Sequence, residues 1–372
     1  MRVHAHPALF LYPCTNPSPP IKPHEPVITL AFMNVNNLYL RYRFGQRTPG
    51  RFGNDPPPPP GWGYLPSNFN GCYRAHDPLQ VGLLADVLGY RGLPDALALC
   101  EVESMQALRH FNHTALGAHY PHAVLVESRD PRQIDVGLLT TLPVRGLKSH
   151  VDDYDPRQKQ YVFSRDCLEV ELELPTGEPL TLLITQLKSR FVDPRAKGAR
   201  REALEARSNQ RRRRQSQAVR AILRERFPCC RYERELFAVV GDLNDVPDSP
   251  WVSPLTQNAG LTDALSLLPP AERWTYWWEK RNQVSQLDYL LLSPALARRV
   301  EQAGCLPRIE RGGLGFSRWL KDGWVGPRQT NLIGGRGGPR KVGFQFERFE
   351  GVLEERGRRA SDHCAVFLEV PC

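Results

Sequence analysis

Residues 236–244 read LFAVVGDLN, and this stretch decides the fold class. Five consecutive apolar residues, Leu236 to Val240, predict a short strand that is buried on both faces. The strand stops at a polar segment that carries Asp242 and Asn244. In open α/β architectures, loops converge at the strand ends while the sheet holds them rigidly, so binding sites form there. The stretch therefore predicts an α/β fold with a polar site at the end of this strand.

The same pattern, an apolar run that stops at a polar residue, recurs along the chain. The run 28–33 ends at Asn34, and the run 96–100 ends at Glu101. Further polar residues beside apolar runs are Asp288, Asp362 and His363. A lone Asp or Asn at such a position is usually a cap or turn residue. Several of them at strand ends together indicate one shared crevice.

Strand and helix signals alternate over most of the chain. Further apolar runs predict strands at residues 123–126, 136–139, 180–184 and 287–292. Helical spacing of apolar residues marks Leu79, Leu83, Val87 and Leu88, and again Val219, Ile222, Leu223 and Phe227. We expect these helices to cover the sheets from outside, which is the pattern of an α/β sandwich.

The composition is that of an ordinary globular protein with an excess of positive charge. The chain has 372 residues, of which 41% are hydrophobic and 24% charged. A net charge of +9 favours a polyanionic partner. The sequence has no run of about 18 apolar residues that could span a membrane and no convincing secretory signal, so we expect a cytoplasmic location. The nine cysteines lack the spacing of a metal site.

Three segments lack a regular period. Residues 1–26 are rich in proline and predict a loose N-terminal extension, which leaves residues 27–372 for the folded domain. An irregular insertion near residues 45–77 contains the run Pro56 to Pro60, for which a polyproline spacer is the simplest interpretation. A second insertion, near residues 306–348, is rich in Gly and Arg, and loops of this length are usually functional or disordered.

Six segments of the chain resemble, in the same order, the signature segments of the endonuclease/exonuclease/phosphatase superfamily. They are NVNNLY, LCEVES, DVGLL, GDLND, LDYLLLS and SDHC. The ordered GDLN, LDY and SDH segments carry most of the specificity, and the resemblance spans roughly residues 28–370. It implies a DNase I-like α/β fold, which is a four-layered α/β sandwich of two mixed β-sheets flanked by helices and housing a divalent metal.

The resemblance also implies a metal site. Glu101 is similar to the residue that binds the metal directly, and Asn34 to a residue that supports the metal shell. Asp362 resembles a second carboxylate on the metal side, which binds either directly or through water. Carboxylate oxygens suit a hard cation, so the expected cofactor is Mg²⁺ or Mn²⁺.

Four further residues match the catalytic positions of the family. Asp242 resembles the residue that orients or deprotonates the attacking water, and Asn244 the amide beside it that contacts phosphate. His363 is similar to the residue that binds the phosphoryl oxygen, and Asp288 to the one that holds its imidazole. These roles suit in-line phosphoryl transfer, in which the protein positions water and neutralises the charge on the phosphate.

Two positions depart from the family pattern. Asn36 lies where related endonucleases usually carry Asp, and Gln186 lies where many relatives carry His. Gln can donate to phosphate but cannot be cationic. Gln186, Lys188 and Arg190 are therefore candidate substrate contacts, although solvated charges on a loop explain Lys188 and Arg190 equally well.

Two surface features leave alternatives open. The run Arg211 to Arg214 lies in a predicted helix and is either a solvated face or a border of the substrate site. In the aromatic segment 274–278, alternation predicts Trp277 on one strand face and the other aromatic side chains on the opposite face. Either bases stack on this segment or its side chains are buried between the layers.

The residues and the resemblance together indicate a metal-dependent phosphoesterase, and the positive charge favours a nuclease. Alternatives within the fold are a phosphomonoesterase and a lipid phosphodiesterase acting on inositol phosphates or sphingomyelin. A catalytically silent binding module is disfavoured because the metal and phosphate residues are complete. We therefore expect nucleic acid as the substrate, with no membrane and no obligate protein partner.

Overall fold

The structure is a computed structural model in which ten segments of the chain are described. They are residues 26–40, 42–44, 63–64, 72–75, 78–278, 283–311, 319–320, 323–324, 328–329 and 360–372. Most of the predicted N-terminal extension and of the two predicted insertions lies outside these residues. The segments that carry the candidate site lie within them.

The first sheet has six strands in the order β18-β22-β1-β5-β7-β6. Their bounds are Arg308–Glu310, Ala365–Pro371, Val27–Leu38, Ala96–Val102, Asp135–Thr140 and His122–Leu125. Strand β1 pairs with β22 antiparallel and with β5 parallel, so the sheet is mixed. The strands predicted at residues 28–33, 96–100, 123–126 and 136–139 are confirmed, with small shifts of their ends.

The second sheet also has six strands, in the order β14-β17-β13-β12-β11-β8. Their bounds are Thr262–Asp263, Asp288–Leu292, Leu236–Asp242, Pro179–Gln186, Cys167–Glu173 and Val144–Lys148. Strands β12 and β13 are parallel, whereas β13 and β17 are antiparallel. Strand β17 therefore begins at the edge of the sheet where β12 and β13 end.

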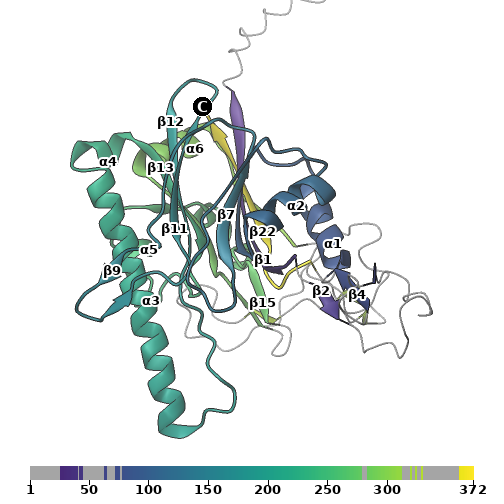
Figure 1. Cartoon of the computed structure of the whole chain (residues 1–372). Coiled ribbons are helices and arrows are strands. Elements are labelled where there is room, and N and C mark those ends of the chain that lie inside the picture. The colour runs from purple at the N-terminus through teal and green to yellow at the C-terminus, as the bar shows by residue number, and fades with distance from the viewer. Residues whose placement is uncertain are drawn as a thin grey trace, which may run out of the picture.

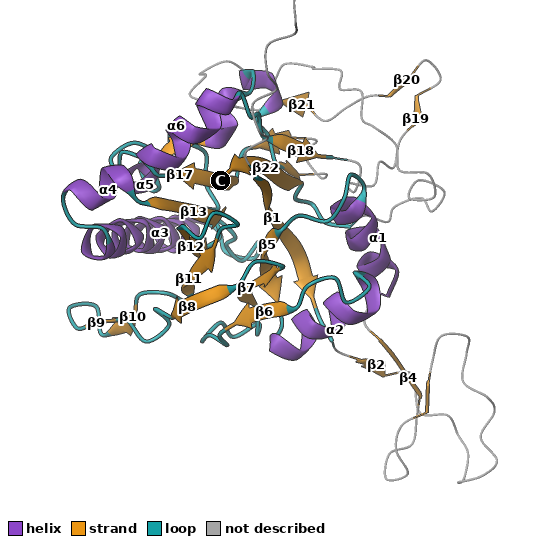
Figure 2. Ribbon diagram, turned by 90° about the horizontal axis from the view of Figure 1, so that it is seen from above, coloured by secondary structure: helices purple, strands orange, loops and turns teal. Residues whose placement is uncertain are grey.

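Helices cover the outer face of each sheet (Figures 1 and 2). Helices α1 (Pro78–Gly89) and α2 (Met105–Ala115) pack on the first sheet. Helix α3 (Gly198–Arg226) and the short α5 (Ser253–Thr256) pack on the second. The layers run helix, sheet, sheet, helix, which confirms the predicted four-layered sandwich. Among the described helices, none is both long and apolar enough to cross a membrane.

Smaller elements complete the described chain. Helix α6 (Pro294–Ala303) adds Leu296 and Val300 to the core between the sheets. It begins after Ser293, whose hydroxyl accepts from the Leu296 amide, and ends at the left-handed Gly304. The other elements are α4 (Cys230–Arg234), β9 (Tyr154–Asp155), β10 (Gln160–Tyr161), β15 (Tyr276–Trp278), β16 (Gln283–Ser285), β2 (Tyr42–Phe44), β3 (Gly63–Tyr64), β4 (Cys72–Ala75), β19 (Trp319–Leu320), β20 (Gly323–Trp324), β21 (Arg328–Gln329) and two 3₁₀ turns, Ala264–Leu267 and Pro270–Glu272.

Strand β13 shows why its sequence is continuously apolar. Ala238 and Val240 face the core between the two sheets, whereas Phe237 and Val239 face the helix layer formed by α3 and α5. Successive side chains of a strand point to opposite faces, so a strand buried on both sides needs apolar residues at every position. The alternation continues to the end of the strand and determines where its last residue, Asp242, points.

Gly241 is required by the close approach of β12 and β13. It is paired with Thr185, and a Cβ at position 241 would overlap the carbonyl oxygen of Thr185. The obstruction is backbone within the sheet and cannot rotate away as a side chain could. A glycine therefore precedes the site residue Asp242 for steric reasons.

We expect Gly241→Ala to lower the free energy of unfolding by about 3 kcal/mol or more, because the added methyl group must separate two paired strands. Urea unfolding followed by circular dichroism measures this loss. The matched control is Gly146→Ala in β8, where an added Cβ would have nothing within 4 Å. Equal stability of the two variants would show that the close approach of β12 and β13 does not require a glycine at position 241.

Candidate active site

The polar residues that end the strands lie on the faces that the two sheets turn toward each other. In β13, Asp242 follows Ala238 and Val240 in the alternation, and both of those residues belong to the core between the sheets. Gln186 of β12 and Asp288 of β17 are the register partners of Asp242 on either side. The candidate site is therefore the polar end of the inter-sheet core.

Glu101 reaches the site through an irregularity in β5. The register of β5 with β7 shifts between Cys100 and Val102, and Glu101 has a left-handed φ of 66°. Cys100 packs in the core between the sheets, but Val102 packs under the helices, so the shift reverses the normal alternation. Left-handed backbone is costly for a residue with a side chain and is concentrated at functional sites.

Two amide side chains join Glu101 to Asp242. Asn34 Nδ2 donates to Glu101 Oε1 at 3.3 Å and to Asp242 Oδ2 at 3.1 Å. Gln186 Nε2 donates to the same two oxygens, at 2.9 and 3.2 Å. Asn34 belongs to the first sheet and Gln186 to the second, so the four side chains bridge the sheets. The side-chain oxygen of Asn34 accepts from the backbone N–H of Asn36 at 2.9 Å, so the side-chain nitrogen of Asn34 faces the carboxylates.

Asn244 holds the other side of the Asp242 carboxylate. Its backbone N–H donates to Asp242 Oδ1 at 2.8 Å, and its Nδ2 donates to Asp242 Oδ2 at 2.9 Å. The same Nδ2 donates to the carbonyl of Leu187 at 3.1 Å, so both amide hydrogens are used. Asn244 has a left-handed φ of 55°, which allows this local turn. In this arrangement Asn244 positions Asp242, and its contact with phosphate stays a prediction.

Asp288 and His363 form a buried pair opposite these carboxylates. Nδ1 of His363 lies 2.9 Å from Asp288 Oδ2, and the Asp288 N–H donates to the hydroxyl of Thr275 at 3.1 Å. Burial opposes the charge on the imidazole, but Asp288, helped by Asp242, outweighs it and raises the pKa of His363 to about 10. The histidine is therefore an imidazolium at neutral pH.

His363 is held from three other directions. Its backbone N–H donates to the hydroxyl of Ser361 at 3.0 Å, and that hydroxyl donates to the carbonyl of Asn34 at 2.7 Å. The ring of Tyr276 lies 4.8 Å from the imidazole, centroid to centroid. The half-buried Asp362 is joined to β15 through its carbonyl, which accepts from the Trp277 N–H at 3.0 Å. These contacts hold the segment around His363 against β1 and β15, which are both distant from it in the sequence.

The donor set fits a divalent cation. In the described part of the site, the carboxylates of Asp242, Asp288 and Asp362 act on the imidazolium of His363, and Glu101 is bridged to Asp242, which leaves an excess of negative charge. Ligand atoms of Asp242, Asp288 and His363 lie within 4.8 Å of one another, and within this group Asp288 is in direct contact with His363. Burial raises the pKa of Asp242, against the influence of His363, and Asp288 acts in the same direction as burial. A bound cation would relieve this crowding of like charge.

Comparison with known proteins gives a family for the chain. The model of the endonuclease/exonuclease/phosphatase family matches residues 34–363. The chain belongs to this family. It is accordingly a phosphoesterase of a superfamily of metal-dependent hydrolases, as the resemblance implied. A comparison with curated protein sequences finds no match.

Solved structures agree with the fold of the family. The catalytic domain of human Nocturnin with bound sulfate aligns over 93% of this chain and 94% of that domain, at 13% identity and a TM-score of 0.50. A β-toxin of Staphylococcus aureus aligns over 92% and 99%, at 12% identity and a TM-score of 0.49. Sphingomyelinase C from Streptomyces griseocarneus aligns over 92% and 99%, at 14% identity and a TM-score of 0.48. At this identity the likeness to Nocturnin concerns the fold alone.

Of the three predicted substrate contacts, Gln186 ends β12, and Lys188 and Arg190 lie just after it. The ammonium of Lys188 is half-buried, and burial together with nearby arginines lowers the pKa of Lys188 to about 8. Arg190 forms an ion pair with the buried Asp245, and 53% of its side chain is exposed. The structure therefore places both cations on one loop beside the bridging residue Gln186.

The arginine run is divided between inside and outside, which corrects both interpretations of the sequence, since a solvated face and a border of the substrate site each place its charges at the surface. Arg212 is fully buried and donates to Asp245 Oδ2 at 2.9 Å and to the Lys188 carbonyl at 2.9 Å. Arg213 is exposed, whereas Arg211 and Arg214 are partly buried. Arg212 is buried with an ion pair to a carboxylate and a hydrogen bond to a carbonyl, while its Nη2 has no hydrogen-bond partner, and the local sequence pattern shows neither contact.

The aromatic segment divides in a similar way. Trp274 is fully buried and Trp277 is 6% exposed, so burial explains both. Tyr276 packs against His363, and Trp278 is 41% exposed. Within β15 the expected alternation holds for Tyr276, Trp277 and Trp278. Trp274 lies before the strand and does not follow it.

Two buried charges near the site were missed by sequence reasoning. Asp245 follows Asn244 directly and anchors Arg190 and Arg212, so its place in GDLND was an available signal. Arg165 donates to the carbonyl of Leu187 at 3.2 Å and to Asp130 at 3.0 Å. Arg165 precedes β11, and because β11 runs antiparallel to β12, it lies at the edge of the sheet where β12 ends. The sequence alone does not give this strand pairing, so it could not place Arg165 near the site.

The raised pKa of His363 predicts a pH-dependent stability. A histidine has an ordinary pKa of about 6.5, so the pair with Asp288 contributes stability that is complete below about pH 6.5 and is lost as pH rises through about 10. We expect the gap in unfolding free energy between wild type and Asp288→Asn, measured by urea with chelator present, to shrink from about pH 7 to about pH 10.

The control for this measurement is Asp263→Asn. Asp263 is a half-buried carboxylate that accepts from Gln286 at 2.6 Å, and loss of solvent around it raises its pKa to about 6. It is ionised above neutral pH, so its gap from wild type should stay constant over the same range. A constant gap for Asp288→Asn as well would contradict the charged pair.

Proposed function

We propose that this chain is a nuclease that uses Mg²⁺ or Mn²⁺ to hydrolyse phosphodiester bonds of nucleic acid by in-line attack of water. The observation that carries the proposal is the juxtaposition of two bridged carboxylates, Glu101 and Asp242, with the imidazolium of His363. One side of the site can hold a cation and a water, and the other can bind a phosphoryl oxygen. This division of charge is what in-line transfer requires.

The proposed roles follow from the contacts. Glu101, with Asp362, would hold the cation, whose chemistry is to neutralise charge on the phosphate oxygens. Asn34 and Gln186 fix the Glu101 and Asp242 carboxylates by their shared hydrogen bonds. Asp242 accepts hydrogen bonds on both oxygens and would orient the attacking water.

His363 would receive a phosphoryl oxygen as a charged donor. Asp288 occupies its Nδ1, which leaves Nε2 to donate to the substrate. Because the pKa of His363 is raised to about 10, the imidazole is already protonated before substrate arrives. The Asp288 carboxylate also sets the direction of the ring.

Nucleic acid is proposed as the substrate because of the positive charge around this acidic centre. The chain carries a net charge of +9 although the site itself is rich in carboxylates. Lys188 and Arg190 lie on the loop beside the site and could contact phosphates that flank the scissile bond. Cations beside the scissile bond bind a polyanion with many phosphates more strongly than they bind a small ester.

Glu101→Gln should weaken divalent-cation binding by at least about tenfold while leaving the fold intact, because one ligand charge is lost from a half-buried position. Calorimetric titration with Mn²⁺ measures the affinity, and urea unfolding checks the fold. The matched control, Glu127→Gln, changes an exposed carboxylate and should bind Mn²⁺ like wild type. Unchanged affinity in Glu101→Gln would remove Glu101 from the metal shell.

Asp242→Asn and His363→Ala should each lower turnover by at least about 100-fold, because each removes a positioned group that acts on the reacting atoms. Rates are to be measured with Mg²⁺ and Mn²⁺ on single-stranded DNA, duplex DNA, RNA and bis(p-nitrophenyl) phosphate, with chelator as a blank. Near wild-type rates in both variants would refute the assigned mechanism. A wild type that hydrolyses only the small ester would refute the nuclease.

A further inference from the structure

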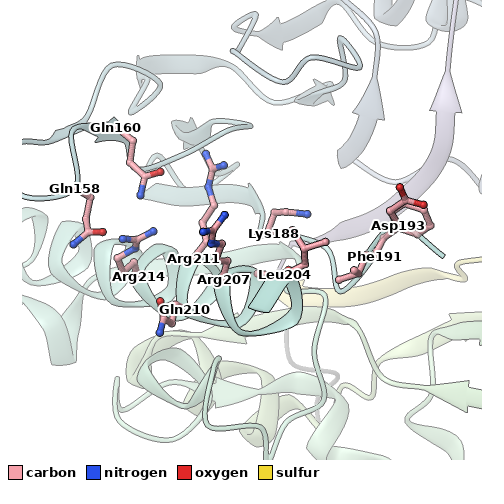
Figure 3. Close-up of a pocket in the computed structure, with 12 residues that line it drawn as sticks. Gln158, Gln160, Lys188, Phe191, Asp193, Leu204, Arg207, Gln210, Arg211 and Arg214 are labelled. Carbon is pink, nitrogen blue, oxygen red and sulfur yellow. The ribbon is translucent and has the colours of Figure 1, made fainter. Parts of the chain in front are cut away.

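A cavity of about 650 Å³ lies beside the proposed active site, between α3, the loop that follows β12 and the β9–β10 hairpin. Figure 3 shows Arg207, Arg211 and Arg214 projecting from α3 on the side where Lys188 lies. The three arginines follow a spacing of four and three residues, which places them on one face of the helix. Lys188 connects the cavity to the proposed substrate loop.

The charge that lines this cavity is unbalanced. Four cationic side chains, Lys188, Arg207, Arg211 and Arg214, face one carboxylate, Asp193. Asp193 in turn accepts a hydrogen bond from the backbone of Arg195 at 2.9 Å. A 650 Å³ space is within the range of about 300–1,000 Å³ that ligand pockets occupy.

Other arginines of α3 have carboxylate partners. Arg212 pairs with Asp245, Arg201 with Glu205, and Arg226 with both Glu169 and Glu171. Three arginines of α3 have a buried nitrogen without a hydrogen bond, Nε of Arg211, Nη2 of Arg212 and Nε of Arg220, and of these only Arg211 lines the cavity. A buried donor without a partner is costly, and an anionic ligand would satisfy it.

Crowding of the cations points the same way. Burial, and then the neighbouring Arg214 and Arg165, lower the pKa of the Arg211 guanidinium. Burial, and then nearby arginines that include Arg211, lower the pKa of Lys188 to about 8. Like charges held together in partly desolvated positions repel one another, and a bound polyanion converts that repulsion into attraction.

An exposed aromatic ring completes the cavity. Phe191 is 72% exposed and lines the cavity beside these cations. A single exposed apolar residue is ordinary on a protein surface. An aromatic ring next to several cations, however, is the combination by which proteins hold single strands, since bases stack on the ring and phosphates bind the cations.

We propose that this cavity binds one unpaired base and the adjoining backbone phosphates of a single-stranded segment of the substrate, outside the scissile bond. The proposal rests on the proposed nuclease function and adds to it a preference for unpaired strands. Only an unpaired strand can turn a base face toward Phe191, because the bases of a duplex are stacked on each other. Arg207, Arg211 and Arg214 would then contact phosphates along the path that leads to Lys188.

Two variants separate the parts of this proposal. Arg207→Gln/Arg211→Gln removes two cavity cations, and Phe191→Ala removes the ring. The matched control is Arg213→Gln/Arg224→Gln, which takes the same charge from exposed positions of the same helix. Fluorescence anisotropy with a labelled oligothymidylate of about 16 nucleotides, with Ca²⁺ in place of Mg²⁺, gives affinity as a function of salt.

We expect the double variant to flatten the salt dependence by about 0.7 for each arginine that contacts phosphate, the value typical of single strands. Phe191→Ala should weaken binding at least about fivefold without changing the slope, because a ring binds no counterion-releasing phosphate. The control pair should keep the wild-type slope. Binding of a blunt duplex should be much less sensitive to Phe191→Ala than binding of the single strand.

Three results would overturn the cavity assignment. They are wild-type affinity and slope in both cavity variants, an equal loss in the control pair, and an equal effect of Phe191→Ala on duplex. Hydrolysis of bis(p-nitrophenyl) phosphate, measured in parallel, reports on the catalytic centre separately. A wild type that binds the single strand through the cavity but hydrolyses neither this ester nor nucleic acid would refute the nuclease while leaving the cavity assignment standing.

Discussion

The double bridge of amides between Glu101 and Asp242 is the contact on which the site depends. Asn34 and Gln186 come from different sheets, and each donates to one oxygen of both carboxylates. Hydrogen bonds to a charged acceptor are stronger than neutral ones, and a carboxylate buried without them would be very costly. The bridge therefore allows the apolar core between the sheets to end in a layer of acids. It also gives a physical meaning to Gln186, since a neutral amide holds both carboxylates without cancelling their charge.

The antiparallel pairing of β13 and β17 divides the site electrostatically. Asp242 and Asp288 are register partners, yet their carboxylates contact different groups. Asp242 is surrounded by amide donors from Asn34, Gln186 and Asn244, whereas Asp288 is used by His363. Two carboxylates this close would repel each other, and the imidazolium compensates part of that repulsion. An acidic side and an imidazolium side therefore lie next to each other where this pair of strands meets the segment that carries His363.

Helix α3 serves both the interior and the surface. Its apolar residues Val219 and Leu223 pack on the second sheet, and Arg212 passes inward to Asp245. Asp245 also binds Arg190, so the buried pair anchors the loop that carries the candidate substrate contacts. A buried guanidinium is tolerated only where a carboxylate and carbonyls surround it. Arg211 and Arg214 of the same run line the cavity, one and two residues away from Arg212 in sequence and on another face of the helix.

The sequence by itself predicted the strands and, together with the family resemblance, the fold class, because both are written in short segments, and it named the candidate residues of the site. Short continuous apolar runs such as 236–240 favour strands buried on both sides, and the polar residues that follow them, such as Asp242 and Asn34, lie together where the strands end. Only the tertiary structure decided how these residues contact one another. The bulge that turns Glu101 toward Asp242, the pairing of Arg212 with Asp245 and the position of Arg165 all depend on which strands are neighbours. Contacts between residues far apart in the chain are set by the packing of whole layers, and no local pattern of charge or hydrophobicity records them.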